Sequence, residues 1–328
     1  MHKTILILTL VSVILVSGCV IPGTSIEIPG LPDIFGVQSE KSDVITIKSL
    51  NAYPSKITSS QEIRLIAYIE NSGKETVGNL DVRGESGVTI NLYDYCVGLF
   101  EIEDGDINCP SGSEKLNSDT EKGCWIPKFL ALETKEVDWI LKPREVELET
   151  PCDVKVSVTY PYETVSLTTI HFINENEYQR QLEEGSFKSR SSSIIQGEGP
   201  IKALLKVLDQ QPIPTTRDIF ASSLEVSNKG SGFVAVKDDG EKRDHMIFLE
   251  SLKYDNSDEK DVCFKDIFED NDYQIQLIQG RTSSKMTCEL KQPTGVEKEL
   301  TKTAEINIKY LYELRKEKKV SVTSPSLG

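Results

Sequence analysis

Most of the chain beyond its N-terminal segment alternates between apolar and polar residues with the two-residue period of a β-strand. The clearest runs are Ile63 to Glu70 and Val154 to Tyr160, and turn-forming clusters such as Asn71 to Lys74 end them. Short strands with turn residues between them are typical of β-sandwiches. The pattern predicts a first sandwich over residues 43–173, with a long polar excursion from Glu101 to Gly123.

The alternation breaks over residues 174–200. Asn174 followed by Glu177 is typical of a helix start, and a short helix is predicted up to about Glu184. Five serines and three glycines then indicate a linker that ends at Pro200. The strand pattern returns afterwards and predicts a second sandwich over residues 201–326.

The second sandwich repeats the first. The block Ile69 to Gly73 matches Val226 to Gly230 at an offset of 157 residues. Farther along, Tyr160 matches Tyr310 at an offset of 150, and neighbouring alternate positions match at the same offset. Two blocks in the same order indicate an internal duplication. The cysteines do not follow it.

The first nineteen residues have a different pattern. A positive head precedes an uncharged run from Ile5 to Val16, which is typical of a secretory signal and short of the roughly 20 residues of a membrane span. The sequence Leu15-Val16-Ser17-Gly18-Cys19 resembles the lipobox of exported lipoproteins, which implies cleavage before Cys19 and a lipid on its sulfur. An ordinary cleaved signal and an uncleaved membrane anchor are the alternatives. We therefore predict a signal peptide over residues 1–18 and a Pro/Gly-rich tether over residues 19–42.

Assigning Cys19 to a lipid leaves six of the seven cysteines. An even set in an exported chain indicates disulfides. In the second sandwich Cys263 and Cys288 are the only pair, so we predict a bridge between them. The first sandwich has four cysteines, which allow three pairings, and we favour the pairs Cys96–Cys152 and Cys109–Cys124.

Charge and residue types argue against several functions. A net charge of −15 disfavours nucleic acid as a partner. His171 and His245 stand alone, and no nucleophile motif or phosphate loop occurs, so we expect no catalytic residue, metal or cofactor and no enzyme. Acidic clusters in the excursion and at Glu269 to Asp272 raise the question of calcium, but neither has EF-hand spacing. The basic cluster from Leu314 to Lys319 is predicted to be a charged hairpin tip.

The Asn-x-Gly turns and Tyr-x-Tyr strands, in tandem behind a lipobox, resemble the immunoglobulin-like repeats of archaeal and bacterial surface proteins. The cell-adhesion-related (CARDB-type) domain is the nearest type. The resemblance implies an all-β fold of two tandem immunoglobulin-like sandwiches and display at the cell surface, and it carries over no site residue. A composition rich in Lys, Glu and Ile points to an archaeal source.

These features together predict a lipoprotein on the extracellular face of the cell membrane, acting as a non-catalytic structural or binding module. Its partner would be an envelope protein or a glycan, and the excursion would be its contact surface, because long loops on rigid sandwiches often carry binding. The alternative is an accessory subunit of an exported enzyme or transporter complex.

Overall fold

The computed structural model of the chain describes residues 43–82, 84–118, 121–238, 241–255, 257–264 and 273–324. The predicted signal peptide, Cys19 and the tether lie outside the described residues, as does the acidic cluster from Glu269 to Asp272. The described residues belong to one compact unit. In the described ranges, no helix is both long enough and apolar enough to cross a membrane.

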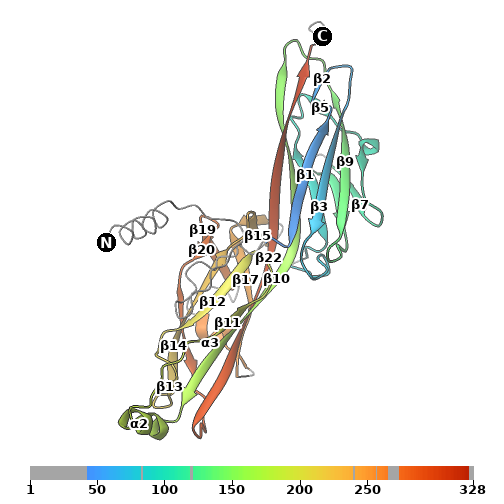
Figure 1. Cartoon of the computed structure of the whole chain (residues 1–328). Helices are drawn as coiled ribbons and strands as arrows, with labels where there is room; N and C mark the ends of the chain where they lie inside the picture. Colours follow the sequence, from blue (N-terminus) through green and yellow to red (C-terminus); the bar gives the residue numbers. More distant parts are fainter. Residues whose placement is uncertain are drawn as a thin grey trace, which may run out of the picture. The chain divides into compact units, whose positions relative to one another are not determined.

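Strands dominate the described chain (Figure 1). Up to the first long strand the elements are β1 (Ile45–Tyr53), β2 (Lys56–Thr58), β3 (Ile63–Asn71), β4 (Val88–Asp94), β5 (Phe100–Glu101), the 3-10 helix η1 (Asp104–Asp106), β6 (Ile107–Asn108), β7 (Glu114–Asn117), β8 (Lys122–Ile126), β9 (Thr134–Pro143) and β10 (Thr150–Ile173). The remaining elements are α2 (Glu175–Glu183), β11 (Ile194–Gln196), β12 (Ile201–Val207), β13 (Ile213–Pro214), β14 (Ile219–Asn228), β15 (Phe233–Asp238), β16 (Glu241–Asp244), β17 (Met246–Tyr254), β18 (Ser257–Asp258), α3 (Lys260–Phe264), β19 (Gln274–Ile278), β20 (Thr282–Ser283), β21 (Met286–Lys291) and β22 (Glu299–Thr323).

Sandwich 1 has two antiparallel layers. In one layer β3 lies between β1 and β9, and in the other β4 lies between β8 and the first part of β10. Alternate side chains of these strands are buried, as the two-residue period requires. Trp139 on β9 is fully buried, and its indole N–H donates to the Lys122 carbonyl of β8 at 2.9 Å. This hydrogen bond ties one layer to the other.

Sandwich 2 has the same strand order. In one layer β14 lies between β12 and β21, and in the other β17 lies between β19 and the first part of β22. The Phe220 ring on β14 contacts Phe172 of β10 at 5.4 Å and Tyr254 of β17 at 5.8 Å between ring centroids. Because such edge-to-face contacts bury large apolar area, these rings form the centre of the second core.

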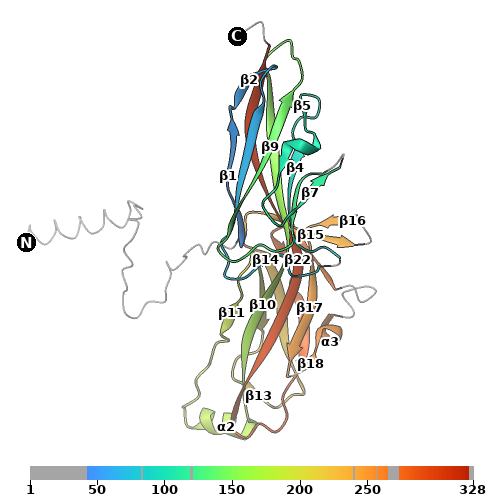
Figure 2. The same ribbon diagram turned by 90° about the vertical axis from the view of Figure 1, so that its right-hand side faces the viewer.

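The long strands β10 and β22 are common to both sandwiches (Figures 1 and 2). They pair antiparallel along their whole length, from Thr150 opposite Val322 to Ile173 opposite Glu299. In sandwich 1, β10 also pairs with β4 and β22 with β2; in sandwich 2, β10 pairs with β11 and β13, and β22 with β17. Each sandwich is therefore completed by a strand that continues into the other.

The centre of this ladder has approximate two-fold symmetry. Tyr160 pairs with Tyr312, Tyr162 pairs with Tyr310, and Pro161 lies opposite Leu311 between them. The offset of 150 residues turns Tyr160 into Tyr310 and Tyr162 into Tyr312, so it exchanges the two tyrosine pairs. An approximate two-fold axis thus passes through the Pro161–Leu311 pair and relates the two sandwiches, which supports the duplication.

The all-β fold class and the short helix are confirmed. Asn174 caps α2 by accepting from the Asn176 N–H at 2.9 Å, whereas Glu177 pairs with Arg180 instead of closing a capping box. Part of the predicted serine-rich linker forms β11 against β10. The boundaries at residues 173 and 201 remain predictions.

The hairpin predicted at Leu314 to Lys319 is wrong, because these residues lie inside β22. The Lys316 ammonium donates to the backbone carbonyls of Ile47 and Lys48 at 3.0 and 3.1 Å. Four cationic residues in five positions favoured a turn in the sequence. In the structure their long side chains extend from a single strand, β22.

Candidate functional site

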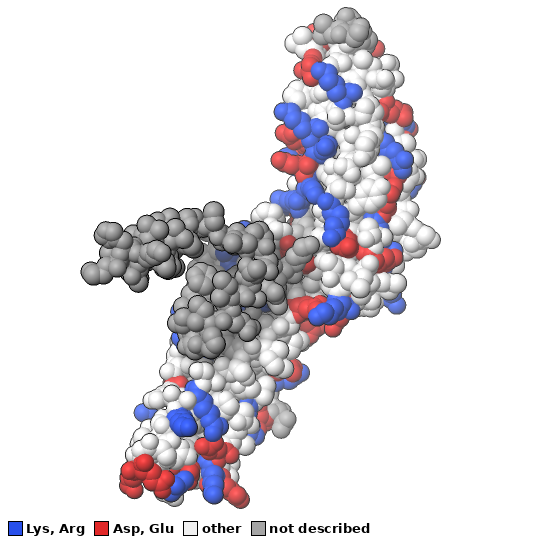
Figure 3. All heavy atoms as spheres, in the orientation of Figure 1, with Lys and Arg blue, Asp and Glu red and all other residues white. Residues whose placement is uncertain are grey.

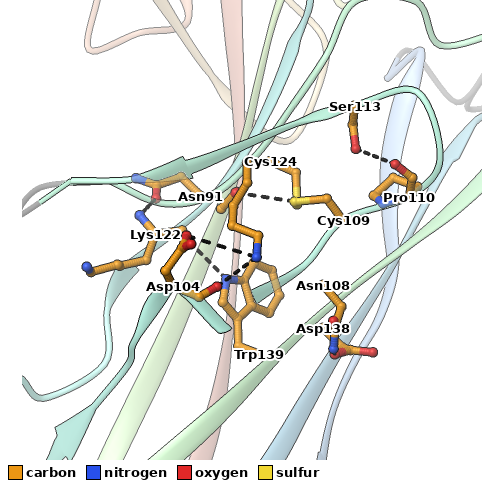
Figure 4. Close-up of a disulfide and its surroundings, with 12 residues drawn as sticks. Asn91, Asp104, Asn108, Cys109, Pro110, Ser113, Lys122, Cys124, Asp138 and Trp139 are labelled. Atoms are coloured by element: carbon orange, nitrogen blue, oxygen red, sulfur yellow. Dashed lines mark hydrogen bonds and ion pairs between the residues drawn. A yellow bond between two sulfur atoms is a disulfide. The ribbon is translucent and has the colours of Figure 1, made fainter. Parts of the chain in front are cut away.

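The excursion from Glu101 to Gly123 is a short, crosslinked structure that lies against β9. It contains β5, η1, β6 and β7, and β7 pairs with β8 from Glu114–Trp125 to Asn117–Lys122. The Cys109–Cys124 disulfide closes it, with 5.7 Å between the two Cα atoms (Figure 4). The crosslink and the β9 pairings fasten the described part of this predicted contact surface to the sandwich.

Four acidic side chains of the excursion, Glu101, Glu103, Asp104 and Asp106, are paired with cations. Lys142 on β9 contacts Glu103 at 2.8 Å and the buried carboxylate of Asp106 at 2.9 Å, and both carboxylates raise the pKa of Lys142. Arg144 pairs with Glu101 at 2.8 Å. In the described part of the chain, no group of three or more metal-ligating side chains could hold an ion. These carboxylates therefore serve to fasten the excursion to β9.

A buried carboxylate supports the base of the excursion. Asp138 on β9 is 5% exposed, and it accepts from Asn108 Nδ2 at 2.6 Å and from Arg64 Nη2 at 2.5 Å. The Asp138 carboxylate raises the pKa of Arg64. A buried charge of this kind is tolerated only with such partners, so Asp138 fixes β6 on β9.

The three disulfides join Cys96 to Cys152, Cys109 to Cys124 and Cys263 to Cys288. The same three pairs are favoured by the sequence. The first links the end of β4 to β10, and the third links α3 to β21. All six cysteines after Cys19 are thus paired.

The junction between the sandwiches is closed by two reciprocal contacts. The carboxylate of Asp43, just before β1, accepts from the Ser231 N–H at 3.1 Å and the Ser231 hydroxyl at 2.6 Å. The carboxylate of Glu198, just before β12, accepts from the Lys74 N–H at 3.2 Å and pairs with its ammonium at 2.9 Å. Each sandwich therefore caps the Asn-x-Gly turn of the other.

The two turns have matching hydrogen bonds. Asn71 donates to the Glu75 carbonyl at 2.8 Å and accepts from the Gly73 N–H at 3.0 Å. Its counterpart Asn228 donates to the Gly232 carbonyl and accepts from the Gly230 N–H, both at 3.0 Å. In each turn the buried amide replaces backbone pairing that the end of the strand would lose.

The tyrosines on the two-fold axis are buried, and burial raises the pKa of Tyr160 and Tyr310 well above the usual range. The Tyr310 hydroxyl bonds to Thr164 Oγ1 at 2.8 Å. The duplication would place residue 314 beside Tyr160, and this residue is Leu314, so the Tyr160 hydroxyl has no counterpart of the bond to Thr164. The symmetry is thus broken at one hydroxyl group.

Arg315 forms a stack on the surface of the junction. Its guanidinium lies 5.4 Å from the ring centroid of Tyr93 on β4 and 5.0 Å from that of Phe233 on β15, and its Nε contacts Glu313 at 2.6 Å. Since β4 belongs to sandwich 1 and β15 to sandwich 2, the stack joins both. On the face shown in Figure 3, Lys and Arg side chains are mixed with Asp and Glu side chains over the surface.

The end of sandwich 2 that is remote from the junction contains a cavity of about 180 Å³ beside α2. Tyr178 of α2 and Phe187 stand edge to face at its wall, with their ring centroids 5.0 Å apart. Asp209, Arg217 and Gln292 contribute polar groups. No sequence motif marks this site, because its residues come from segments that are far apart in the chain.

The remaining histidines do not form a site. The His171 Nδ1 lies 3.0 Å from Thr301 Oγ1, and burial lowers the pKa of His171. His245 occupies a positive-φ position between β16 and β17, next to Gly280. Each histidine is held by its own strand or turn, far from the other in the fold.

No family model and no curated protein matches the chain. Among solved structures, it is similar to the collagen-binding domain of Erysipelothrix rhusiopathiae surface protein RspB, with 10% identity and a TM-score of 0.17, over 87% of this chain and 95% of that one. It is also similar to the collagen adhesin (CNA) from S. aureus, with 11% identity and a TM-score of 0.14, over 86% and 94% of the two chains. Similarity of this degree assigns no function to the chain.

Proposed function

We propose that this chain is a lipoprotein of the extracellular membrane face, anchored through Cys19, and that its two sandwiches act as a non-catalytic structural or binding module. The observation that carries the proposal is the place where the chain enters the described structure. Asp43 lies at the junction, bonded to Ser231 of sandwich 2. A tether from Cys19 would hold the module near its middle and leave both ends accessible to partners.

The shared strands support a role in display. Because β10 and β22 run through both sandwiches, the distance between the two ends is set by a continuous sheet rather than by a flexible linker. A rigid module of this kind presents its loops with little loss of conformational entropy on binding. One set of loops includes the excursion, and the other surrounds α2.

The end of sandwich 1 has the exposure expected of a contact surface. Tyr53 at the end of β1, and Val97 and Leu148 in connections between strands, are 59%, 62% and 73% exposed. Lys56, the first residue of β2, pairs with Glu149 at 2.9 Å, and the Cys96–Cys152 disulfide fixes the connection after β4. Exposed apolar side chains on ordered loops favour a protein or glycan partner in the envelope.

We further infer that the repeats belong with CARDB-type repeats of archaeal surface proteins. The observations behind this inference are the duplicated Asn-x-Gly turns at Asn71 and Asn228, the matching strand orders and the lipobox at Cys19.

Affinity capture from detergent-solubilised membranes tests the proposed function. The full chain should be recovered in the membrane fraction, together with envelope proteins or glycans that are released when the excursion or the loops at the ends of the sandwiches are altered. Recovery of one stoichiometric enzyme or transporter would instead favour the accessory-subunit alternative. A chain that is found in the soluble fraction with no partner would contradict both.

A further inference from the structure

Strand β22 has an open edge in sandwich 1. On the side away from β10, its pairing with β15 ends at Glu313 and its pairing with β2 begins at Ser321. Between them, residues 314–320 have no strand partner on this side among the residues that the structure describes. At about 3.3 Å per residue this open edge is roughly 23 Å long, which is enough for a strand of about seven residues.

The open edge presents backbone hydrogen-bonding groups. The Ser321 N–H points away from β10, because it donates to the Ser55 carbonyl at 2.9 Å. Backbone groups of successive residues in a strand point to opposite edges, so those of Arg315, Glu317 and Lys319 point outward as well. All three residues are exposed. Unpaired N–H and C=O groups on a sheet edge are a template for an added strand.

In sandwich 2 the equivalent edge is occupied. The offset of 150 residues maps the open edge of β22 onto residues 164–170 of β10. There β11 adds as an antiparallel strand: the Gly197 N–H donates to the Val165 carbonyl at 2.8 Å, and the Thr169 N–H donates to the Ser193 carbonyl at 2.9 Å. Strand β13 on β10 corresponds in the same way to β2 on β22. Among the described residues, β11 has no counterpart on β22.

The side chains of the open edge select an acidic strand. Arg315, Lys316, Lys318 and Lys319 stand there with a single acidic residue, Glu317. Arg315 pairs with a neighbouring carboxylate and Lys316 donates to β1 carbonyls, whereas Lys318 and Lys319 have no ion pair with any described residue. Lysines on an edge exclude strands of like charge, including the same edge of a second copy. An acidic strand would instead pair with them.

We propose that the open edge of β22 binds an extended acidic segment of an envelope protein, which adds as an antiparallel strand in the position that β11 has on β10. Backbone hydrogen bonds would supply affinity, and acidic side chains beside Lys318 and Lys319 would supply specificity. This inference rests on the proposed function and gives the chemistry of its protein partner.

Hydrogen exchange of the full chain in detergent, followed by mass spectrometry, tests the site with two synthetic seven-residue peptides. One peptide alternates Glu with Val, and the control peptide alternates Lys with Val. At saturation, the acidic peptide should slow exchange of the Glu317 and Lys319 amides at least tenfold, and the basic peptide should leave it unchanged.

Two variants separate backbone pairing from charge. Glu317→Pro removes an outward N–H that the β10 ladder does not use, so the chain should still fold and should bind the acidic peptide at least tenfold more weakly. Lys318→Glu combined with Lys319→Glu should reverse the preference and favour the basic peptide. Lys188→Glu combined with Lys206→Glu makes the same change in net charge at exposed lysines of sandwich 2, and this control should bind like the wild type.

The inference is overturned if the acidic peptide leaves exchange unchanged, or if the charge-reversed variant binds it as tightly as the wild type. Protection of the same amides without peptide would show that the chain's own tether or a second copy occupies the edge, and would also overturn it. If affinity capture recovers an envelope partner equally with the wild type and the charge-reversed variant, the display function stands and the edge site is rejected. If the peptide binds this edge in a chain that is absent from membranes, the site stands and the anchored display function is rejected.

Discussion

Asp43 and Ser231 lie 188 positions apart in the sequence, yet the Asp43 carboxylate accepts from both the backbone N–H and the hydroxyl of Ser231. The reciprocal contact places Glu198 on the Lys74 turn. Together with the continuous β10–β22 ladder, these contacts join the two sandwiches at the junction. The consequences for stability can be measured.

The shared strands predict cooperative unfolding. If sandwich 2 unfolded alone, it would remove one half of β10 and of β22 from the sheet and expose the Tyr160–Tyr312 pair at the junction. Differential scanning calorimetry of the oxidised chain should therefore show a single transition, with equal calorimetric and van't Hoff enthalpies. Two separate transitions would show that the sandwiches unfold independently.

The contact between Glu198 and Lys74 predicts a loss of stability in acid. Hydrogen bonds from the Lys74 side chain and backbone lower the pKa of Glu198 below its usual value. The unfolded state therefore takes up a proton before the folded state does as the pH falls, and the stabilisation present at neutral pH is lost as the pH drops through the folded pKa. Glu198→Gln should flatten the decline in Tm between about pH 5 and pH 3.

Glu62→Gln, at an exposed position of sandwich 1, is the control for the pH experiment and should leave the decline in Tm unchanged. If the Tm of Glu198→Gln fell as steeply with decreasing pH as the Tm of the wild type, a stabilising role of the Glu198 contact would be contradicted.

The broken symmetry of the central tyrosines predicts unequal effects of the same substitution. Tyr310→Phe removes the bond to Thr164 and should cost about 1 kcal/mol of unfolding free energy. Tyr160→Phe removes a hydroxyl that has no such side-chain bond, because Leu314 stands where Thr164 would be matched, so it should cost less unfolding free energy than Tyr310→Phe. Urea denaturation of both variants gives the comparison, and a larger loss for Tyr160→Phe would contradict the assignment.

The disulfides should differ in their contributions according to the loops they close. The loop lengths are 56 residues for Cys96–Cys152, 25 for Cys263–Cys288 and 15 for Cys109–Cys124. The chain-entropy model then predicts that replacing each pair by alanine lowers the unfolding free energy by about 4, 3.5 and 3 kcal/mol, in that order. Denaturant titrations of the three double variants test this order, which would be contradicted if the Cys109–Cys124 variant were the least stable.

The sequence was sufficient for the fold class but not for the joint between the sandwiches. Alternation identified the strand at Val154 to Tyr160, and matching Tyr-x-Tyr segments indicated the duplication. The alternating run recognised in the sequence ended at Tyr160, just before Pro161, and proline cannot donate to a ladder. In the structure the strand continues past Pro161 as one element, since its cross-strand partner β22 is equally long.

The contacts between remote residues had no local signal. Asp43 and Glu198 are single acidic residues in irregular segments, and nothing near them in the sequence specifies Ser231 or Lys74 as partners. The cavity around Gln292 was missed for the same reason. By contrast, the excursion was found because its polar run and flanking cysteines are contiguous, and the pairing of its carboxylates with Lys142 and Arg144 required the fold.

The measurement that tests the proposed function most directly is mass spectrometry of the N-terminal peptide of the chain isolated from membranes. An anchored display module requires a mature N-terminus at Cys19 carrying the added mass of lipid, and two chains are needed for stable anchoring. Cys19→Ala should release the chain from the membrane. An unmodified N-terminus at another residue, or complete release of the wild type by a salt wash, would contradict the account.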